Sequence, residues 1–262
     1  MLFGLPVFSD TSSNGVLVLV LVYFLSFFIK GAVGVGSLSP VILLSTFLLG
    51  PHRAVLLGLT TNALSQIQFV PQGIRDGDWK IARRVIIANY IGAAVGVWIF
   101  GRLDSTWLTL ILGAALGLVA AAEQWKLLAL LSERVDLFRT GLLVPLAGIA
   151  GLVSGVSGAG GIFFIAAYLR HVCPDARTFR GTMLLLSALL VGWRMALLVA
   201  SGYITRQTWL EASVLCPVAF LGGLSGTWFY RRLPTARFYQ IFQIVLLLAA
   251  ASLVWKGLSD VT

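Results

Sequence analysis

The chain has 262 residues, of which 58% are hydrophobic and 11% are charged, and its formal net charge is +9 at pH 7. A soluble domain carries about 25% charged residues, so this composition excludes a soluble protein and indicates an integral membrane protein. The Lys and Arg residues stand in short clusters between apolar runs, as they do in the cytoplasmic loops of membrane proteins. We therefore expect no nucleic-acid partner.

The first apolar run, at about 15–30, has no Lys or Arg before it and so lacks the charged region that opens a cleaved signal peptide. We expect this run to stay in the protein as a membrane helix. Further apolar runs follow, separated by charged or Gly/Pro-rich breaks. They lie at about 38–50, 54–72, 81–101, 106–122, 141–153, 161–170, 178–201, 209–230 and 236–256.

The two halves of the chain resemble each other. The glycine-rich stretches at 31–36 and 155–160 align at one constant offset, and Arg53 aligns with Arg177 at the same offset. Self-similarity of this kind indicates two copies of one structural unit. The sequence therefore divides into a first repeat at 1–122, a cytoplasmic linker at 123–140 and a second repeat at 141–262.

The distribution of cations favours inverted over parallel repeats. If the glycine-interrupted segments at 15–50 and 141–170 each enter the membrane and return, thirteen Lys and Arg residues face one side and four face the other. Such an excess marks the cytoplasmic side. The sequence therefore predicts an all-α polytopic membrane protein of two inverted-topology repeats, each a glycine-broken hairpin plus three transmembrane helices. Both termini would lie outside the cytoplasm.

The glycines have two alternative explanations. Broken helices in inverted repeats are typical of secondary transporters, and a broken helix presents N–H groups and a positive dipole end to an anion. Glycines spaced four apart also allow helices to pack closely. The dense, symmetric stretches at 31–37 and 155–161 favour breaks. Close packing is the better explanation for two pairs on uninterrupted helices, Gly92 with Gly96 and Gly222 with Gly226.

The polar residues within the apolar runs suit an anion. Arg194 lies deep in the run 178–201, where an ionisable residue indicates a functional site unless it is structurally paired or snorkels. Lys30 borders the first glycine-rich stretch and is open to the same two readings. Asn62 and Gln66 are four residues apart and so share a helix face, which suits interhelical bonding or anion binding. No Asp or Glu lies centrally in an apolar run, so no carboxylate relay for proton coupling is evident.

The cysteines and histidines indicate neither a disulfide framework nor a metal site. Cys173 and Cys216 lie far apart, and the two His residues are equally scattered, without the spacing of metal ligands. Neither His52 nor His171 lies in an apolar run, which argues against an intramembrane enzyme. We expect no cofactor and no enzymatic activity.

An ordered set of motifs resembles a known family. The breaks GAVGVGSLSP and GVSGAGGIFF each lead through an arginine-bearing loop, PHRA or PDARTFRGT, into the next helix, and YRRLPTARF follows near the end. Over nearly the whole chain this set resembles the TauE/SafE family of sulfite and organosulfonate permeases. The resemblance implies a multi-pass transporter of the bacterial inner membrane that carries a small sulfur-containing anion. It places the substrate site at Gly34, Gly36, Ser37, Asn62, Gln66, Gly158, Gly160, Gly161 and Arg194. Lys30 and Trp193 are further candidates for substrate contacts.

Other functions stay compatible with the sequence. An anion channel or uniporter, for example for thiosulfate, would share this polar inventory, and a membrane assembly subunit without transport is a further alternative. The expected partners are a small anionic substrate and membrane lipid. The sequence leaves open the direction of transport, any coupling ion and the oligomeric state, with a homodimer among the options.

Overall fold

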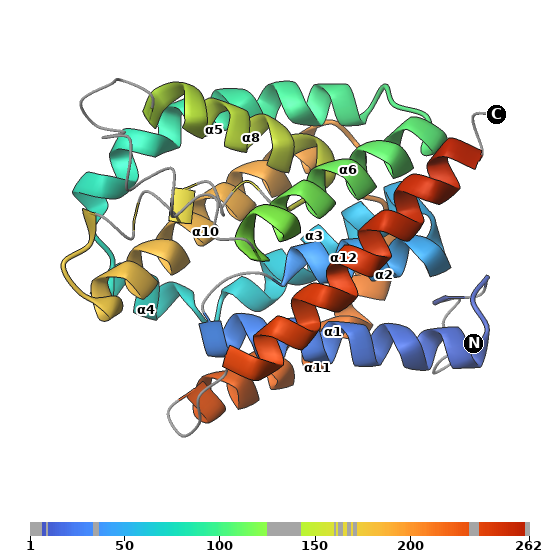
Figure 1. Ribbon diagram of the computed structural model, residues 1–262, viewed down its shortest axis with the longest axis horizontal. Coiled ribbons are helices and arrows are strands. Elements are labelled where there is room, and N and C mark those ends of the chain that lie inside the picture. The colour runs from blue at the N-terminus through green and yellow to red at the C-terminus, as the bar shows by residue number, and fades with distance from the viewer. Residues whose placement is uncertain are drawn as a thin grey trace.

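Helices form every regular element that the computed structural model describes (Figure 1). The described residues are 7–8, 10–33, 37–124, 143–159, 161, 165–166, 169, 172–230 and 236–259. Four of their helical segments are long and apolar enough to cross a bilayer: Ser13–Ala32, Trp79–Phe100, Arg177–Ala200 and Arg206–Phe229. The prediction of an all-α polytopic membrane protein is confirmed.

Each half contributes a series of helices that follows the apolar runs of the sequence. The first half contains α1 (Ser13–Val33), α2 (Leu38–Leu49), α3 (Pro51–Gln66), α4 (Val70–Asp76), α5 (Trp79–Phe100) and α6 (Ser105–Gln124). The second half contains α8 (Leu143–Ser157), α10 (Ala176–Ala200), α11 (Arg206–Tyr230) and α12 (Ala236–Ser259). Aspartates cap two of these helices, because Asp78 accepts hydrogen bonds from the first turn of α5 and Asp175 accepts one from the first turn of α10.

The apolar run at 54–72 forms two helices where the sequence suggests one. Helix α3 ends at Gln66, and α4 starts again at Val70 after a turn of three residues. Pro71 explains the restart, because proline lacks the N–H that a helix interior needs and fits only in a first turn. The counterpart in the second half, α10, continues for 25 residues.

The interrupted segments include helices too short to cross a membrane. Helix α2 has 12 residues and α8 has 15, which correspond to about 18 Å and 22 Å at the rise of an α-helix. The hydrocarbon core of a bilayer is about 30 Å thick. In the second half the chain also folds back after the break, because a Cβ on Gly161 would collide with the carbonyl oxygen of Ala150 in α8.

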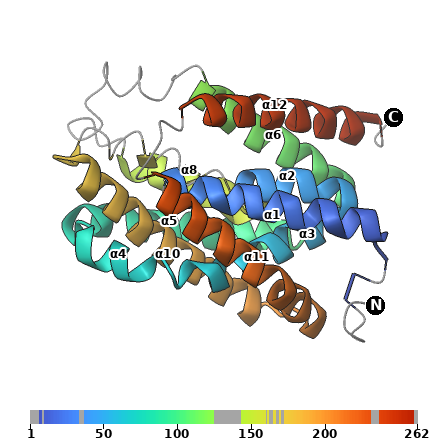
Figure 2. The ribbon, with the colours of Figure 1, turned by 90° about the horizontal axis from the view of Figure 1, so that it is seen from below.

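Glycines hold helices of one half in close contact with helices of the other half. Helix α5 packs against α8, and α11 packs against α1 (Figures 1 and 2). A Cβ on Gly92 or Gly96 would collide with the backbone of α8, and one on Gly222 or Gly226 would meet the backbone of α1. This confirms the packing interpretation of those two pairs.

Two glycines that the sequence assigns to breaks lie inside helices instead. Gly31 is within α1 and Gly155 is within α8. A Cβ on Gly31 would collide with Gly223 of α11, and one on Gly155 would lie within 2.7 Å of Gly96 in α5. These two glycines therefore serve helix packing, and the breaks begin only after Val33 and Ser157.

The last helix of each half, α6 and α12, forms a further contact between the halves. Helix α6 packs against α12, and the two run antiparallel, because Gly257 lies against Leu110 while Gly117 lies against Ala250. Helix α1 begins and α12 ends at the same end of the molecule (Figure 1). The opposite end, where α4 ends and α5 and α10 begin, is called the cationic end below. It carries Arg75, Lys80, Arg83, Arg84, Arg177 and Arg180.

Candidate functional site

A buried arginine lies beside the break in the second half. Helix α8 ends at Ser157, and Gly158 takes φ +87°, a left-handed conformation that suits glycine. The position that a Cβ would occupy on Gly158 is 3.4 Å from Nη1 of Arg194, which α10 supplies. The same position is in contact with Ile42 of α2 and Val55 of α3. The structure thus places the arginine beside the break.

Arg194 has no hydrogen-bond partner within the described residues. The residue is 3% exposed, and its Nε, Nη1 and Nη2 atoms are all buried and unpaired. No ion pair of the described chain joins it to an Asp or Glu. Buried charges are normally paired, because an isolated ion loses its hydration. Within the described residues, the N–H donors of the guanidinium group are therefore all without an acceptor.

A buried lysine lies beside the break in the first half, and it is well satisfied. Lys30 is 2% exposed, and its Nζ donates to Oδ1 of Asn62 at 2.6 Å and to Oε1 of Gln66 at 2.5 Å. The ammonium group also lies 5.6 Å from the ring centre of Phe27 and 5.3 Å from that of Phe69. Amide oxygens and aromatic faces both favour a cation.

The same lysine is next to the start of a half-length helix. Ser37 precedes α2, and its side chain forms no cap; its hydroxyl instead donates to Oδ1 of Asn62 at 3.4 Å. The first N–H groups of α2 and the positive end of its dipole therefore lie near Lys30. This arrangement suits an anion.

The predicted site residues form two groups, which we call the Lys30 group and the Arg194 group. The Lys30 group contains Lys30, Ser37, Asn62 and Gln66, and the Arg194 group contains Arg194 and Gly158. Val55, which adjoins the Arg194 group, and Asn62 are seven residues apart on α3, or about 10 Å along the helix axis. Helices α2 and α3 contact both groups. Gly34, Gly36 and Gly160 lie outside the described residues.

Trp193 packs against Tyr90 of α5. Its ring stacks on Tyr90 of α5 with the centroids 4.9 Å apart and the planes 11° apart. Its indole N–H donates to the carbonyl oxygen of Tyr90 at 3.1 Å. The donor and one ring face of Trp193 are therefore engaged by the protein itself.

An ion pair that sequence reasoning does not anticipate joins the two halves at the end opposite the cationic end. Glu211 of α11 has a side chain only 1% exposed, and its carboxylate accepts hydrogen bonds from Arg53 of α3 and from Gln207. Asp10 also lies within 3.6 Å of Arg53. The sequence places Glu211 near a helix end, and the repeat equivalence of Arg53 with Arg177 is the signal that could have identified the pair.

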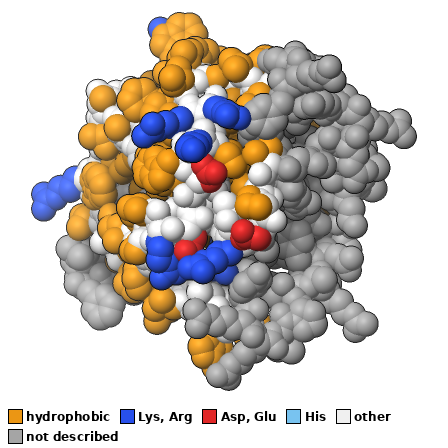
Figure 3. All heavy atoms as spheres, turned by 90° about the vertical axis from the view of Figure 1, so that its left-hand side faces the viewer, with side chains coloured by type: hydrophobic (Ala, Val, Ile, Leu, Met, Phe, Trp, Pro, Cys, Tyr) orange, Lys and Arg blue, Asp and Glu red, His pale blue; other side chains and the backbone are white. Residues whose placement is uncertain are grey.

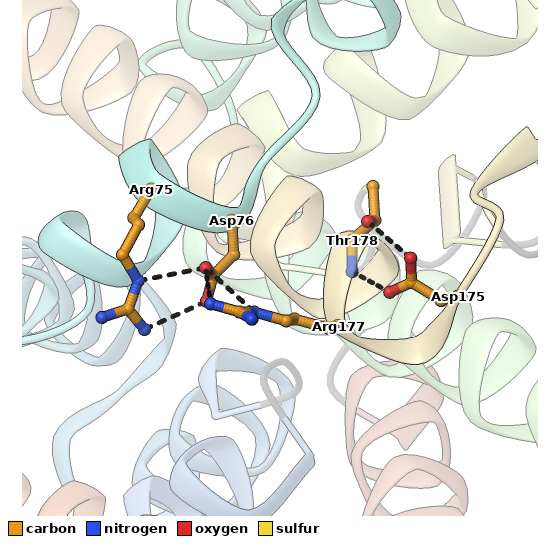
Figure 4. A network of polar contacts seen from close by, with 5 residues as sticks. All are labelled: Arg75, Asp76, Asp175, Arg177 and Thr178. Carbon is orange, nitrogen blue, oxygen red and sulfur yellow. Dashed lines mark hydrogen bonds and ion pairs between the residues drawn. The ribbon is translucent and has the colours of Figure 1, made fainter.

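A matching network joins the halves at the cationic end (Figures 3 and 4). Asp76, at the end of α4, accepts hydrogen bonds from Arg75 in the same helix and from Arg177 in α10. These bonds lower the pKa of the Asp76 carboxyl from its ordinary value to about 2. Figure 3 shows the surrounding surface, where Lys and Arg side chains gather around a few carboxylates. Arg53 and Arg177, which align in the sequences of the two halves, thus each contact a carboxylate in the other half.

Within the described residues, no cluster of three His, Cys, Asp or Glu residues could hold a metal ion. The polar groups near the two breaks are instead cations, amides and hydroxyls. Such a set can donate hydrogen bonds to an oxyanion and place positive charge beside it.

Comparisons with known proteins give a family and a relative. Residues 19–253 match the family described as Sulfite exporter TauE/SafE. The chain is also 22% identical over 185 residues to a protein of Comamonas testosteroni described as "Probable inner membrane transporter protein TsaS", in an alignment that covers 68% of this chain and 74% of the relative. No solved structure gives a significant match.

Proposed function

Because the chain belongs to the sulfite exporter TauE/SafE family, we propose that it is a secondary transporter that moves a small sulfur-containing oxyanion, sulfite or an organosulfonate. The family and the relative's description support a membrane transporter of the inner membrane, and the four apolar spans suit that location. The proposal adds the identity of the substrate to these findings.

One observation carries the substrate class: each half buries a cation beside a helix break, and neither cation has a carboxylate partner within the described chain. Leaving a charge unpaired inside a protein costs several kcal/mol. An anionic solute supplies the missing partner and removes that cost. Cationic and neutral solutes would leave the guanidinium of Arg194 unpaired.

The packing of helices from one half against helices from the other half supports an alternating-access mechanism. Helices α6 and α12 hold equivalent places in the two halves and run antiparallel, which supports an inverted arrangement of the repeats. In such transporters the halves rock around a site near the midplane. The two groups would then belong to one path, with the Arg194 group nearer one membrane face and the Lys30 group nearer the other.

The membrane potential can drive this transport. With the cell interior negative, export of a monoanion is favourable by about 2.3 kcal/mol per 100 mV. Export therefore needs no coupling ion, which suits a chain whose described carboxylates all lie near helix ends or in connecting segments.

The test is a flux assay with the purified protein in liposomes. We expect labelled sulfite to enter liposomes in a saturable manner, and unlabelled sulfite preloaded on the inside to accelerate entry by counterflow. Counterflow separates a transporter from an anion channel, which shows none. Empty liposomes and liposomes with Arg194→Met protein are the controls. Flux that equals that of empty liposomes for sulfite, thiosulfate and sulfoacetate alike would refute the proposal.

A further inference from the structure

Helix α4 is a short, separate element that packs on α10 (Figure 2). It has seven residues, and a turn at 67–69 separates it from α3. Pro71 lacks the backbone N–H that would bond to the carbonyl oxygen of Ile67 in a continuous helix. At the other end of α4, Gly77 has an extended conformation. Breaks in the helical hydrogen-bond ladder thus bound α4 on both sides, and the helix can tilt about them.

The turn before α4 lies against the Lys30 group, on the side of the cationic end. Helix α3 runs toward that end, so Phe69 lies beyond Gln66 on this side. The ring centre of Phe69 is 5.3 Å from Nζ of Lys30, and Phe69 is 4% exposed. A tilt of α4 away from α10 would therefore move one of the two aromatic rings that adjoin the ammonium group.

Helices α4 and α10 are in contact through their backbones. A Cβ on Gly73 of α4 would lie 2.8 Å from the backbone nitrogen of Leu185. A Cβ on Gly181 of α10 would lie 2.3 Å from the carbonyl carbon of Asp76. At both points the space between the helices is too small for a methyl group. The contact therefore closes completely here, and a side chain added to Gly181 must push α4 away.

Two polar contacts hold the end of α4 on α10. Nη2 of Arg177 donates to Oδ1 of Asp76 at 2.9 Å (Figure 4), and the backbone N–H of Asp78 donates to Oγ1 of Thr182 at 2.9 Å. The Arg177 side chain is 71% exposed, and an exposed ion pair adds little stability. The pair at the opposite end has a buried carboxylate, on Glu211, and a buried pair costs more to break. The cationic end is thus the easier one to open.

We propose that α4 is a lid that opens the Lys30 group toward the cationic end by tilting away from α10. This proposal rests on the proposed transport function, in which the anion reaches its site from one membrane face at a time. Helix α10 is the fixed partner, because it continues without a break and accepts a hydrogen bond from Nε2 of Gln66 on the carbonyl oxygen of Leu184 at 3.3 Å. Opening separates Asp76 from Arg177 and withdraws Phe69 from Lys30. The structure shows the lid closed.

The test measures how fast a thiol in the Lys30 group reacts with a membrane-impermeant maleimide. Ser37→Cys is the reporter, because Ser37 is 2% exposed, and it is placed in protein that carries Cys173→Ser and Cys216→Ser. Labelling is measured in membrane vesicles of both orientations. Lys80→Cys, at an exposed position of the cationic end, replaces the reporter in a parallel sample and shows which vesicles expose that end.

Two changes should open the lid, and each has a matched control. Gly181→Ala inserts a methyl group between α10 and α4, whereas Gly192→Ala adds one to the same helix where no atom lies within 4 Å. We expect about tenfold faster labelling in Gly181→Ala and no change in Gly192→Ala. Arg177→Gln removes the bond to Asp76 and should accelerate labelling about two- to fivefold. Arg75→Gln should have no effect, because its bond to Asp76 lies within α4.

The faster labelling should occur only in vesicles that expose the cationic end. Equal rates in the reporter protein, Gly181→Ala and Arg177→Gln, or faster labelling from the opposite face, would overturn the lid. If Gly181→Ala does not fold, Arg177→Gln decides alone, since its side chain is exposed. The flux assay separates the two proposals. Protein that labels as expected but shows no flux would keep the lid and refute the transport function, and protein that shows flux with equal labelling rates would refute the lid alone.

Discussion

Lys30 and Arg194 are two buried cations in opposite halves, each beside a helix break. They differ in the hydrogen-bond acceptors that surround them. Lys30 has two amide acceptors and two aromatic rings around its ammonium group. Arg194 has no acceptor within the described residues. The fold itself supplies the partners of the first cation, whereas the second has none among the described residues. On this difference we propose that Arg194 is the principal anion-binding group and that Lys30 is a preorganised charge.

The chemistry of the two side chains fits these roles. A guanidinium group presents five donors in a planar fork and binds oxyanions through two parallel hydrogen bonds. An ammonium group is a compact point charge, and here its contacts to Asn62 and Gln66 fix its position. The predictions below test whether the two cations differ in this way.

The largest effect is expected from Arg194→Met. We expect the variant to lose about 10- to 100-fold in apparent affinity for sulfite, because a charge-assisted bond to an anion contributes about 1.5–3 kcal/mol. The substrate-free protein should melt at a higher temperature than wild type, since an unpaired buried charge is removed. Flux and thermal unfolding measure the two effects. Arg102→Gln is the control, because Arg102 is exposed and stacks 3.7 Å over Trp98 at the surface.

Lys30→Met should act on stability in the opposite direction. The change leaves Oε1 of Gln66 without its donor and Oδ1 of Asn62 with only the hydroxyl of Ser37, so we expect a loss of about 2 kcal/mol in the free energy of unfolding. The affinity for sulfite should fall about tenfold because a nearby positive charge is lost. Melting temperatures that shift in the same direction for Lys30→Met and Arg194→Met would contradict the distinction between the two cations.

Gly158→Ala tests the backbone beside Arg194. An alanine at φ +87° is strained by about 1–2 kcal/mol, and its Cβ would also collide with Ile42. Gly202→Ala is the matched control, because Gly202 has φ +72° with no atom within 4 Å of the added Cβ. We expect a lower melting temperature for both variants and a lower affinity for sulfite only in Gly158→Ala. Equal transport by the two variants would remove Gly158 from the site.

The smallest effects are expected at the cationic end, where the cations are exposed and paired. Arg177→Gln should lower the melting temperature slightly and Arg75→Gln less, because only Arg177 joins α10 to Asp76 of α4. High salt should reduce both differences. The lowered pKa of Asp76 means that its contribution to stability is complete above about pH 4 and is lost as the pH falls through about 2. The melting temperature of Asp76→Asn relative to wild type should therefore be constant from pH 5 to pH 8.

The sequence predicted the helices well because apolar runs and glycine spacing are local signals. The packing role of Gly92 and Gly222 followed from their four-residue partners on uninterrupted helices, and contacts between α5 and α8 and between α1 and α11 confirm it. The division of α3 from α4 was missed, although Pro71 was a local sign of it. The roles of Gly31 and Gly155 were wrong because their contacts with other helices are not visible in a single sequence.

The candidate site could be predicted only by residue type. The sequence identified Arg194, Asn62 and Gln66 as intramembrane polar groups, but their grouping depends on tertiary packing. The structure places the two amides on Lys30 and leaves Arg194 with Gly158.

The most direct test of the central claim, that Arg194 binds the transported oxyanion, is thermal unfolding with and without sulfite in the wild-type protein and in Arg194→Met. A ligand at 100 times its Kd stabilises the native state by about 2.7 kcal/mol. We expect sulfite to raise the melting temperature of the wild-type protein and to leave that of Arg194→Met unchanged, even though the variant melts higher without ligand. An equal rise in both proteins would contradict the claim.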